Sequence, residues 1–379
     1  MKILIAPDKF KGSLTAVEAA GQIESGIKKV SPETECLKIP MADGGEGTVQ
    51  SIISATGGKI IPVKAMDPLM REVDSFFGLT GEGDTAVIEM AAASGLGLLK
   101  PGERNPLLTT SYGTGQLILE ALKTGAKKII IGLGGSATND GGSGMAEALG
   151  VEFSDKENRI IHPRGDNLEK IRVINKSKLE KSIWKTKIII ATDVRNVMCG
   201  SAGASRVFGP QKGATPRMVE LLDNNLSHFG KLLEDTFKKN IMSLPGSGAA
   251  GGMAASLIAF SNAEIMPGFE VIDKLIGFES KVMSADIIIT GEGRIDSQTF
   301  QGKTPWSVLC LAKKHGKTVL AITGHYETGG NKQLEPTFDA VFPIVEYPCS
   351  LEEAIRDAPA LVCRTAERMM KLIMLTRTF

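Results

Sequence analysis

Short apolar runs alternate with segments of helical periodicity along most of this chain. The runs are only a few residues long and rich in β-branched residues, which predicts buried β-strands. We expect these strands at residues 1–7, 33–41, 127–133, 186–194, 285–293 and 318–324. The segment 14–30 predicts a helix instead, because its apolar residues recur at mostly helical spacing. These residues are Leu14, Val17, Ile23, Ile27 and Val30.

Polar residues and glycines mark where several predicted helices begin and end. Thr15 and Glu18 have the spacing of a capping box, and so do Ser350 and Glu353. A glycine after the last periodic residue commonly ends a helix, so Gly125 ends the helix predicted near 113–124. The chain therefore carries local signals for helices that follow its strands.

The alternation of strands and helices predicts an α/β fold in which helices cover parallel sheets. The region 62–113 departs from this rhythm. Within it, residues 73–90 predict an antiparallel hairpin around a glycine-containing turn. The length of 379 residues suggests two or three domains, and no repeat or obvious linker separates them.

Composition excludes several classes of function. The net charge is +1 and aromatic residues make up 5%, so neither nucleic acid nor a membrane surface is an expected partner. No apolar run approaches the ~18 residues that a membrane-spanning helix needs. The five cysteines are far apart and form no C-x-x-C pair, which predicts a reduced, cytoplasmic protein.

Glycine, with 43 residues, is concentrated in loops that follow or approach the predicted strands. Parallel α/β sheets bind ligands at the carboxyl ends of their strands, where such loops gather. Each glycine taken singly is more often a turn residue than a ligand contact, so the repetition carries the argument. The loops are 42–48, 132–144, 199–214, 245–253 and 290–304.

Carboxylates recur at or near these loops, and lysines lie in the same segments. Carboxylates beside glycine-rich backbone can bind Mg²⁺, orient a hydroxyl group or accept its proton while the backbone binds phosphate. A single aspartate after a strand can also merely cap the next helix. The carboxylates are Asp8, Asp43, Glu46, Asp140, Asp193, Glu292 and Asp296, and the lysines are Lys9, Lys11, Lys212 and Lys303.

The loop 132–144 has three interpretations at this stage. Its glycines can form a tight turn, or they can let an anionic ligand approach the backbone. Gly132, Gly134 and Ala137 also fit the G-x-G-x-x-A pattern of dinucleotide-binding loops, with Asp155 near the expected acidic position. A nicotinamide-dependent hydroxy-acid dehydrogenase is therefore an alternative function, and a binding protein without catalysis is another.

Seven blocks together closely resemble the bacterial glycerate kinase family whose members form 2-phosphoglycerate. The resemblance is dense from residue 1 to about residue 325 and looser beyond. Long blocks in one order are far more specific than a single glycine pattern. The blocks are MKILIAPDKFKGSLTA, IPMADGGEGT, VIEMAAASGL, RNPLLTTSYGTG, GLGGSATNDGG, VFGPQKGAT and TGEGRIDSQTFQGKTP.

The resemblance implies an ATP- and Mg²⁺-dependent kinase that phosphorylates D-glycerate at its 2-hydroxyl group. It implies two domains. Residues 1–62 and 285–379 would form a Rossmann-like parallel-sheet domain from both chain ends, and residues 63–284 an inserted α/β domain with an antiparallel element. Glycerate and ATP would be the partners. The sequence does not decide between a monomer and a homodimer.

The resemblance also assigns the candidate site residues. Among the positions carried over, our first choice for the catalytic base is Asp193, with Asp296 second. Asp43 and Glu46 are expected to bind the metal, with contact to the substrate as the alternative. After Asp193 relatives commonly have proline where this chain has Val197, so Asn196 is carried over with less support. The residues implied to bind substrate or phosphate are Asp8, Lys11, Ser13, Gly44, Gly45, Gly47, Gly134, Gly135, Ser136, Thr138, Asn139, Asp140, Asn196, Gln211, Lys212 and Arg294.

Overall fold

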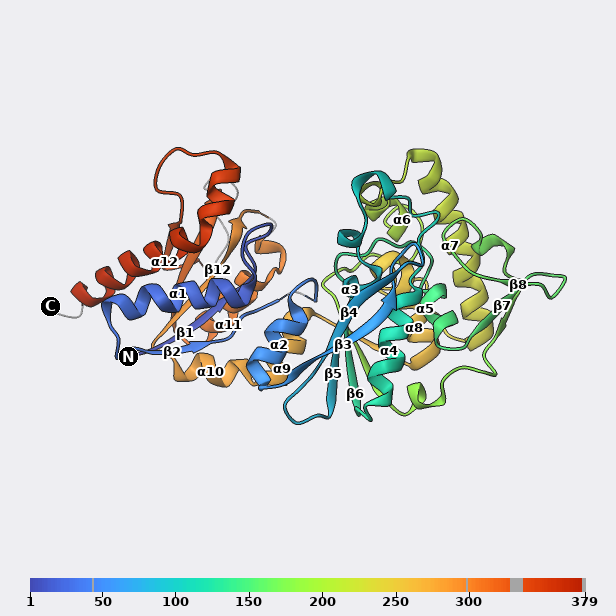
Figure 1. Ribbon diagram of the computed structural model, residues 1–379, viewed down its shortest axis with the longest axis horizontal. Helices are drawn as coiled ribbons and strands as arrows, with labels where there is room; N and C mark the ends of the chain where they lie inside the picture. Colours follow the sequence, from blue (N-terminus) through green and yellow to red (C-terminus); the bar gives the residue numbers. More distant parts are fainter. Residues whose placement is uncertain (43, 298, 328–336, 377–379) are drawn as a thin grey trace. The chain divides into compact units, whose positions relative to one another are not determined.

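The computed structural model describes residues 1–42, 44–297, 299–327 and 337–376 of the chain (Figure 1). The chain divides into two compact units. Unit 1 comprises Met1–Asp43, Gln50–Gly57 and Phe269–Phe379, and unit 2 comprises Gly44–Val49 and Gly58–Gly268. The boundaries expected at residues 62 and 285 stay predictions. No helix among the described residues is long and apolar enough to cross a membrane.

Unit 1 is built on a parallel sheet with the strand order β14-β13-β12-β1-β2. The central strand β1 pairs in parallel with β12 on one side and β2 on the other. Strands from both ends of the chain therefore share one sheet, which confirms the predicted fold class. The strands are β1 (Lys2–Pro7), β2 (Glu35–Lys38), β12 (Ile287–Ile295), β13 (Thr318–Tyr326) and β14 (Ala340–Pro343).

Helices α1 (Ala16–Val30) and α12 (Leu351–Thr376) lie side by side in unit 1 (Figure 1). Their buried residues form one apolar core with Ile3, Ile5 and Ile289 of the sheet. The predicted capping box at the start of α1 is present, since the Thr15 hydroxyl accepts from the Glu18 amide. The remaining helices of this region are α2 (Thr48–Thr56), α9 (Gly268–Ile276), α10 (Phe278–Ser284) and α11 (Thr304–Lys314).

Unit 2 is built on a mixed sheet with the strand order β11-β10-β6-β5-β4-β3. The inner strands are parallel, whereas β3 and β4 run antiparallel. The β4–β5 pair is the hairpin that the sequence predicts at 73–90. The strands are β3 (Lys59–Met66), β4 (Glu72–Leu79), β5 (Thr85–Glu89), β6 (Lys128–Gly132), β10 (Lys187–Ala191) and β11 (Glu264–Met266).

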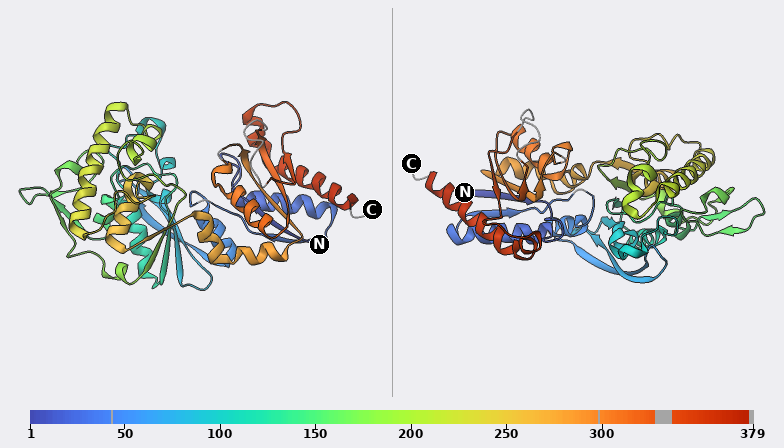
Figure 2. Two further views of the ribbon diagram at one scale, coloured as in Figure 1. Left: turned by 180° about the vertical axis from the view of Figure 1, so that it is seen from behind. Right: turned by 90° about the horizontal axis from the view of Figure 1, so that it is seen from above.

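A second, small antiparallel sheet belongs to unit 2 and was not predicted from the sequence. It has the order β8-β7-β9 and is the green segment that projects from this unit (Figure 2). Its strands are β7 (Glu152–Ser154), β8 (Ile160–Ile161) and β9 (Val173–Asn175). The helices of unit 2 are α3 (Ala91–Ser94), α4 (Tyr112–Lys123), α5 (Ser143–Ala148), α6 (Ala204–Phe208), α7 (Pro216–Phe237) and α8 (Ala249–Ser261).

Candidate active site

Two carboxylates lie at the carboxyl ends of adjacent strands in unit 1. Asp8 follows β1 and is 6% exposed, and Glu292 lies in β12 and is 8% exposed. The Asp8 amide donates to the Gly291 carbonyl oxygen at 2.8 Å, which continues the pairing of the two strands. The parallel register therefore brings together two acidic residues that are nearly 300 positions apart in the sequence.

Burial raises the pKa of the Glu292 carboxyl group from 4.5 to about 7. The Thr299 hydroxyl donates to Glu292 Oε1 at 2.7 Å and works against this rise, as does Lys303. The negative charges of Asp8 and Asp296 add to the rise in pKa. Glu292 can therefore gain or lose a proton near neutral pH, which is typical of functional carboxyl groups.

Arg294 and Asp296 form an ion pair just beyond these carboxylates. Arg294 Nε lies 3.0 Å from Asp296 Oδ2, and a second guanidinium nitrogen donates to Glu327 Oε2 at 3.0 Å. Two carboxylates thus neutralise Arg294 before any ligand binds. An anion would compete with both of them for this guanidinium.

Lys11 and Ser13 follow β1 but differ in their surroundings. Lys11 is exposed and forms no hydrogen bond or ion pair within the described part of the chain. The Ser13 hydroxyl donates to the Ile355 carbonyl oxygen at 2.8 Å. Lys11 can therefore reach a ligand, whereas Ser13 joins two distant segments of unit 1.

The loop 44–49 of unit 2 rests on the ends of β6 and β10. The Gly134 amide donates to the Gly44 carbonyl oxygen at 3.1 Å. A Cβ atom added to Gly44 would lie 2.5 Å from the Ala191 carbonyl oxygen, and the φ angle of Gly44 is +85°. Only glycine fits both conditions, so this residue serves close backbone packing.

Glu89, which the sequence analysis did not single out, fixes the same loop. It ends β5 and is 4% exposed. Its Oε1 accepts from the amides of Gly47 at 3.0 Å and Val49 at 2.8 Å, at the start of α2. A carboxylate is favourable there because the first amides of a helix lack partners within the helix.

The glycine-rich loop 132–144 has an outer and an inner part. Gly134 is half-buried, Gly135 is exposed and Ser136 is 8% exposed, so this part borders solvent. Thr138, Asn139 and Asp140 are fully buried. A ligand that arrives from solvent can therefore contact the outer part of the loop. The assignment of the three inner side chains stays a prediction.

The inner glycines lie so close to neighbouring segments that no side chain would fit. A Cβ atom added to Gly144 would lie 2.0 Å from Thr110 Oγ1. Gly142 has a φ angle of +75°, and an added Cβ would lie 2.8 Å from the Met253 Cα atom of α8. Tight turns and close packing therefore explain these glycines without a ligand. Within the loop, only residues 134–136 keep the interpretation as a ligand-binding segment.

Asp140 holds the buried end of this loop. Its Oδ2 accepts from the amide and the hydroxyl group of Ser111, at 2.8 and 2.7 Å, and its Oδ1 accepts from the Gly142 amide at 3.0 Å. Burial raises the pKa of the carboxyl group, and these hydrogen bonds lower it. Asp140 thus joins the loop to the start of α4.

Lys212 lies against the border between the outer and inner parts. It is 1% exposed, and its Nζ donates to Ser136 Oγ and to the Thr138 carbonyl oxygen, both at 2.7 Å. Burial lowers the pKa of the ammonium group from 10.5 to about 7, and the charge of Asp140 partly opposes this. Lys212 therefore places a buried amine directly behind Ser136, which is next to the exposed Gly135.

Two buried polar atoms beside Lys212 have no hydrogen-bond partner among the described residues. They are Thr138 Oγ1 and Asn139 Nδ2. Asn139 Oδ1 does accept from the Ser205 hydroxyl at 3.1 Å. Buried polar atoms are usually hydrogen-bonded, so these two atoms are exceptions in the interior of unit 2.

Asp193 lies just beyond β10 and is exposed. Its Oδ1 accepts from the Gly268 amide at the start of α9, at 3.0 Å, which orients the carboxylate. Nearby, Asn196 donates from Nδ2 to the Ala202 carbonyl oxygen at 2.9 Å and so holds its own loop. Gln211 is exposed beside the buried Lys212.

The predicted metal ligands Asp43 and Glu46 are only partly described. Asp43 lies outside the described residues, and Glu46 is exposed. No group of three or more histidine, cysteine or acidic side chains that could hold a metal ion occurs in the described part of the chain. Asp43 and Glu46 therefore stay predicted metal ligands; Mg²⁺ that is bound mainly by phosphates needs only one or two protein carboxylates.

The dinucleotide pattern lacks its structural context. A dinucleotide-binding loop leads directly into a helix. Here α5 begins at Ser143, after two left-handed glycines, and extends only to Ala148. Asp155 accepts from the amides of Glu157 and Arg159 within its own turn. Nothing supports the dehydrogenase alternative.

Sequence reasoning missed Glu89, Ser111 and Thr299, and it noted Glu292 without choosing it. Glu89 and Glu292 share one usable signal, since each follows a run of buried strand residues. Ser111 and Thr299 have no such local signal. Their roles arise only from carboxylates that approach them in the folded chain.

Comparison with known proteins agrees with the resemblance of the sequence blocks. A model of the "Glycerate kinase family" matches residues 3–374. The chain is 47% identical to a glycerate kinase of Bacillus subtilis over all of its own length and 99% of the relative's. It is 44% identical to glycerate 2-kinase of Escherichia coli K12, with 97% of both chains covered.

A solved structure also matches along the whole chain. It is a crystal structure from Salmonella typhimurium LT2, assigned there as a glycerate kinase 2. The TM-score is 0.89, the sequences are 44% identical, and both chains are fully covered. The chain therefore belongs to the glycerate kinase family.

Proposed function

We propose that this protein transfers the γ-phosphoryl group of ATP to D-glycerate and so forms 2-phosphoglycerate. The observation that carries the proposal is membership of the family along almost the whole chain, with a relative named glycerate 2-kinase at 44% identity. The exposed rim at residues 134–136, with the amine of Lys212 behind it, suits an anionic substrate.

In the proposed reaction Asp193 accepts the proton of the glycerate 2-hydroxyl group. The hydroxyl oxygen then forms a bond to the γ-phosphorus, and the bond from this phosphorus to the bridging oxygen of ADP breaks. The Gly268 amide orients the Asp193 carboxylate, which reduces the reorganisation needed for proton transfer. Asp296 is the weaker candidate because its carboxylate is already paired with Arg294.

Charge stabilisation would come from backbone amides and cationic side chains. Gly134, Gly135 and Ser136 offer the exposed rim, and Lys212 supplies positive charge behind it. Mg²⁺ would be held by Asp43 and Glu46 together with the nucleotide phosphates, whose negative charge it neutralises. Removal of divalent ions with a chelator should abolish turnover, and added Mg²⁺ should restore it.

The test is ADP release from ATP, Mg²⁺ and D-glycerate, with the product identified by ³¹P NMR. We expect stoichiometric 2-phosphoglycerate. Formation of 3-phosphoglycerate would keep the kinase but contradict the assigned hydroxyl group. A folded sample that releases no ADP with D-glycerate would contradict the proposed function itself.

The proposal also places the enzyme in the cytoplasm, in keeping with its five free cysteines. Sedimentation of the purified protein with and without substrates would decide between a monomer and a homodimer.

A further inference from the structure

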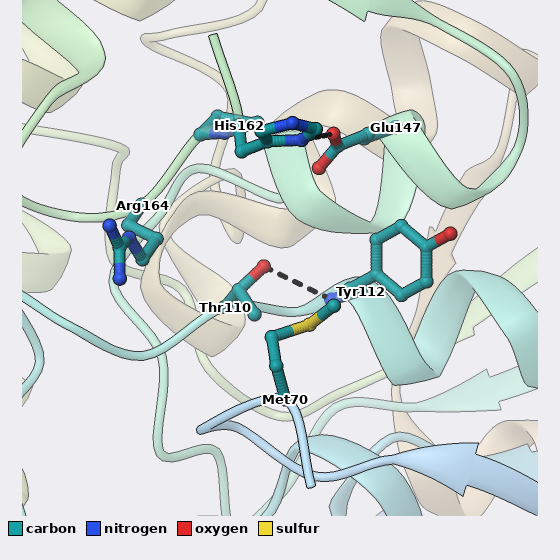
Figure 3. A pocket seen from close by; sticks show the side chains of 7 residues that line it. Met70, Thr110, Tyr112, Glu147, His162 and Arg164 are labelled. Carbon is teal, nitrogen blue, oxygen red and sulfur yellow. Dashed lines mark hydrogen bonds and ion pairs between the residues drawn. The ribbon is translucent and has the colours of Figure 1, made fainter. Parts of the chain in front are cut away.

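Unit 2 contains a hollow that none of the predicted catalytic, substrate or metal residues line. Its volume is about 460 Å³, which is within the usual range for small-molecule pockets. Figure 3 shows the labelled side chains arranged around it. The lining residues are Met70, Thr110, Tyr112, Glu147, His162, Pro163 and Arg164.

One wall of the pocket is a tightly held turn between β3 and β4. The buried Asp67 carboxylate accepts from the amides of Leu69 and Arg71, at 2.8 and 2.9 Å. The turn places Met70 in a left-handed backbone conformation, with a φ angle of +62°. Such a conformation is unfavourable for a non-glycine residue, so packing and hydrogen bonds of the turn must maintain it.

The neighbouring wall is also rigid. The Thr110 amide donates to the Pro68 carbonyl oxygen at 2.9 Å, and the Tyr112 amide donates to Thr110 Oγ1 at 3.3 Å. Ser111, between the two, is bonded to the buried Asp140. The pocket is therefore preformed, and binding would require little rearrangement.

The ionisable side chains around the pocket differ in their partners. His162 Nδ1 lies 2.5 Å from Glu147 Oε1, so these two side chains satisfy each other. Arg164 is exposed, and within the described part of the chain its guanidinium group forms no hydrogen bond or ion pair. Arg164 thus contributes an unpaired cation that can bind a carboxylate or phosphate through two parallel hydrogen bonds.

The rest of the lining is largely apolar. Met70, Pro163 and Tyr112 line the pocket and can offer apolar surface to a hydrocarbon body. An adaptable methionine and an aromatic ring are well suited to such contacts.

We propose that this pocket binds a small organic anion, with its carboxylate or phosphate group on Arg164 and its apolar body against Met70 and Tyr112. The site is separate from the proposed kinase chemistry and does not depend on it.

The test uses ¹⁹F NMR of protein in which tyrosine is replaced by 3-fluorotyrosine. The chain has only three tyrosines, of which Tyr326 and Tyr347 belong to unit 1. Loss of one signal in Tyr112→Phe assigns the reporter of the pocket. Phenyl phosphate, benzoate and benzyl alcohol share an apolar body and differ in the head group. We expect both anions to shift the Tyr112 signal until the site is saturated. Benzyl alcohol should need a concentration at least tenfold higher for the same fraction of the shift.

Variants distinguish the pocket from other anion sites. Arg164→Gln should weaken binding of both anions by about tenfold or more, as expected for loss of a charge-assisted hydrogen bond. Arg217→Gln removes another exposed arginine whose guanidinium group has no hydrogen bond or ion pair among the described residues, and it should leave binding unchanged. Ser136→Ala, at the rim of the proposed active site, should also leave the Tyr112 shift unchanged.

Three outcomes would overturn the proposal. The first is equal affinity of wild type and Arg164→Gln for the anions. The second is a Tyr112 shift at the same concentration of benzyl alcohol as of benzoate. The third is no Tyr112 shift up to the solubility limit of either anion. A difference between phenyl phosphate and benzoate would identify the preferred head group. Arg164 lies in unit 2, so unchanged circular dichroism and thermal unfolding of Arg164→Gln would show that the fold is retained.

Discussion

A buried acid in unit 1 and a buried amine in unit 2 form the most instructive comparison in this protein. Burial raises the pKa of Glu292 to about 7 and lowers the pKa of Lys212 to about 7. In both cases removal from water disfavours the charged form. The same physical cause therefore brings two opposite groups to the point where each can exchange a proton near neutral pH.

The surroundings of the two groups differ. Glu292 is near like charges on Asp8 and Asp296, and one hydroxyl donor, Thr299, offsets them. Lys212 donates to two neutral oxygens that fix its position behind Ser136. In unit 1 several carboxyl groups therefore lie close together near the strand ends. In unit 2 one amine, that of Lys212, lies behind the glycine-rich loop.

The largest expected effect decides which unit supplies the catalytic base. Asp193→Asn in unit 2 should lower kcat by about 10²–10⁴-fold, because it removes the proton acceptor while keeping the shape of the side chain. Asp296→Asn in unit 1 should lower kcat by only about tenfold. Rates of ADP release measure both. A larger loss in Asp296→Asn would reverse the assignment, and unchanged thermal unfolding would exclude misfolding.

The second comparison removes the buried amine. Lys212→Met should lower kcat/KM by roughly 10–100-fold, the usual cost of losing a hydrogen bond from a charged group. The free energy of unfolding at pH 6 should not fall, because a costly buried charge is lost as well. Lys127→Met, on the surface of the same unit, should match wild type. Full activity in Lys212→Met would refute a role for the amine.

Helix packing in unit 1 provides a third test, away from both titrating groups. A Cβ atom added to Gly26 of α1 would lie 2.2 Å from the Cys363 carbonyl oxygen of α12. Gly26→Ala should therefore destabilise the fold by about 1–3 kcal/mol. Gly21→Ala, in the same helix with nothing within 4 Å, should stabilise it by about 0.5–1 kcal/mol. Chemical unfolding measures both, and equal effects would contradict the close approach.

The smallest effect is the pH dependence of stability. Between about pH 4.5 and 7 the folded state keeps a proton on Glu292 that the unfolded state releases, so rising pH favours unfolding. Between about 7 and 10.5 the unfolded state binds a proton on Lys212 that the folded state has released, so rising pH favours folding. Each group should change the free energy of unfolding only across its own pH window.

Unfolding of two variants at several pH values separates these contributions. The difference between wild type and Glu292→Gln should vary only below about pH 7. The difference between wild type and Lys212→Met should vary only above about pH 7. A difference that is constant with pH for either variant would show that burial does not shift that group's pKa as described.

Much of the local structure was predictable because its causes lie within a few residues. The run Ile188–Ile190 is buried in β10, as its β-branched composition predicts. The capping boxes at Thr15 and Ser350 are present, and Gly125 adopts the left-handed conformation that ends α4. Each of these outcomes depends on contacts between near neighbours in the sequence, which a single segment can encode.

The candidate site was predictable only in part. The sequence identified the strand-end carboxylates and the glycine-rich loops. It did not reveal that the Asp140 carboxylate is hydrogen-bonded to Ser111, or that Glu89 accepts hydrogen bonds from the loop 44–49. Nor did it indicate that inner glycines such as Gly144 serve packing. These facts depend on which distant segments meet, and local patterns carry no information about that.

The sequence by itself determined the α/β rhythm, the helix ends and the family to which the chain belongs. Tertiary structure alone decided which of the charged groups are removed from water. Glu292 and Lys212 look like ordinary charged residues in the sequence, and only burial by segments far along the chain shifts their pKa values. Desolvation is a property of the assembled surroundings, and so it cannot be read from neighbouring residues.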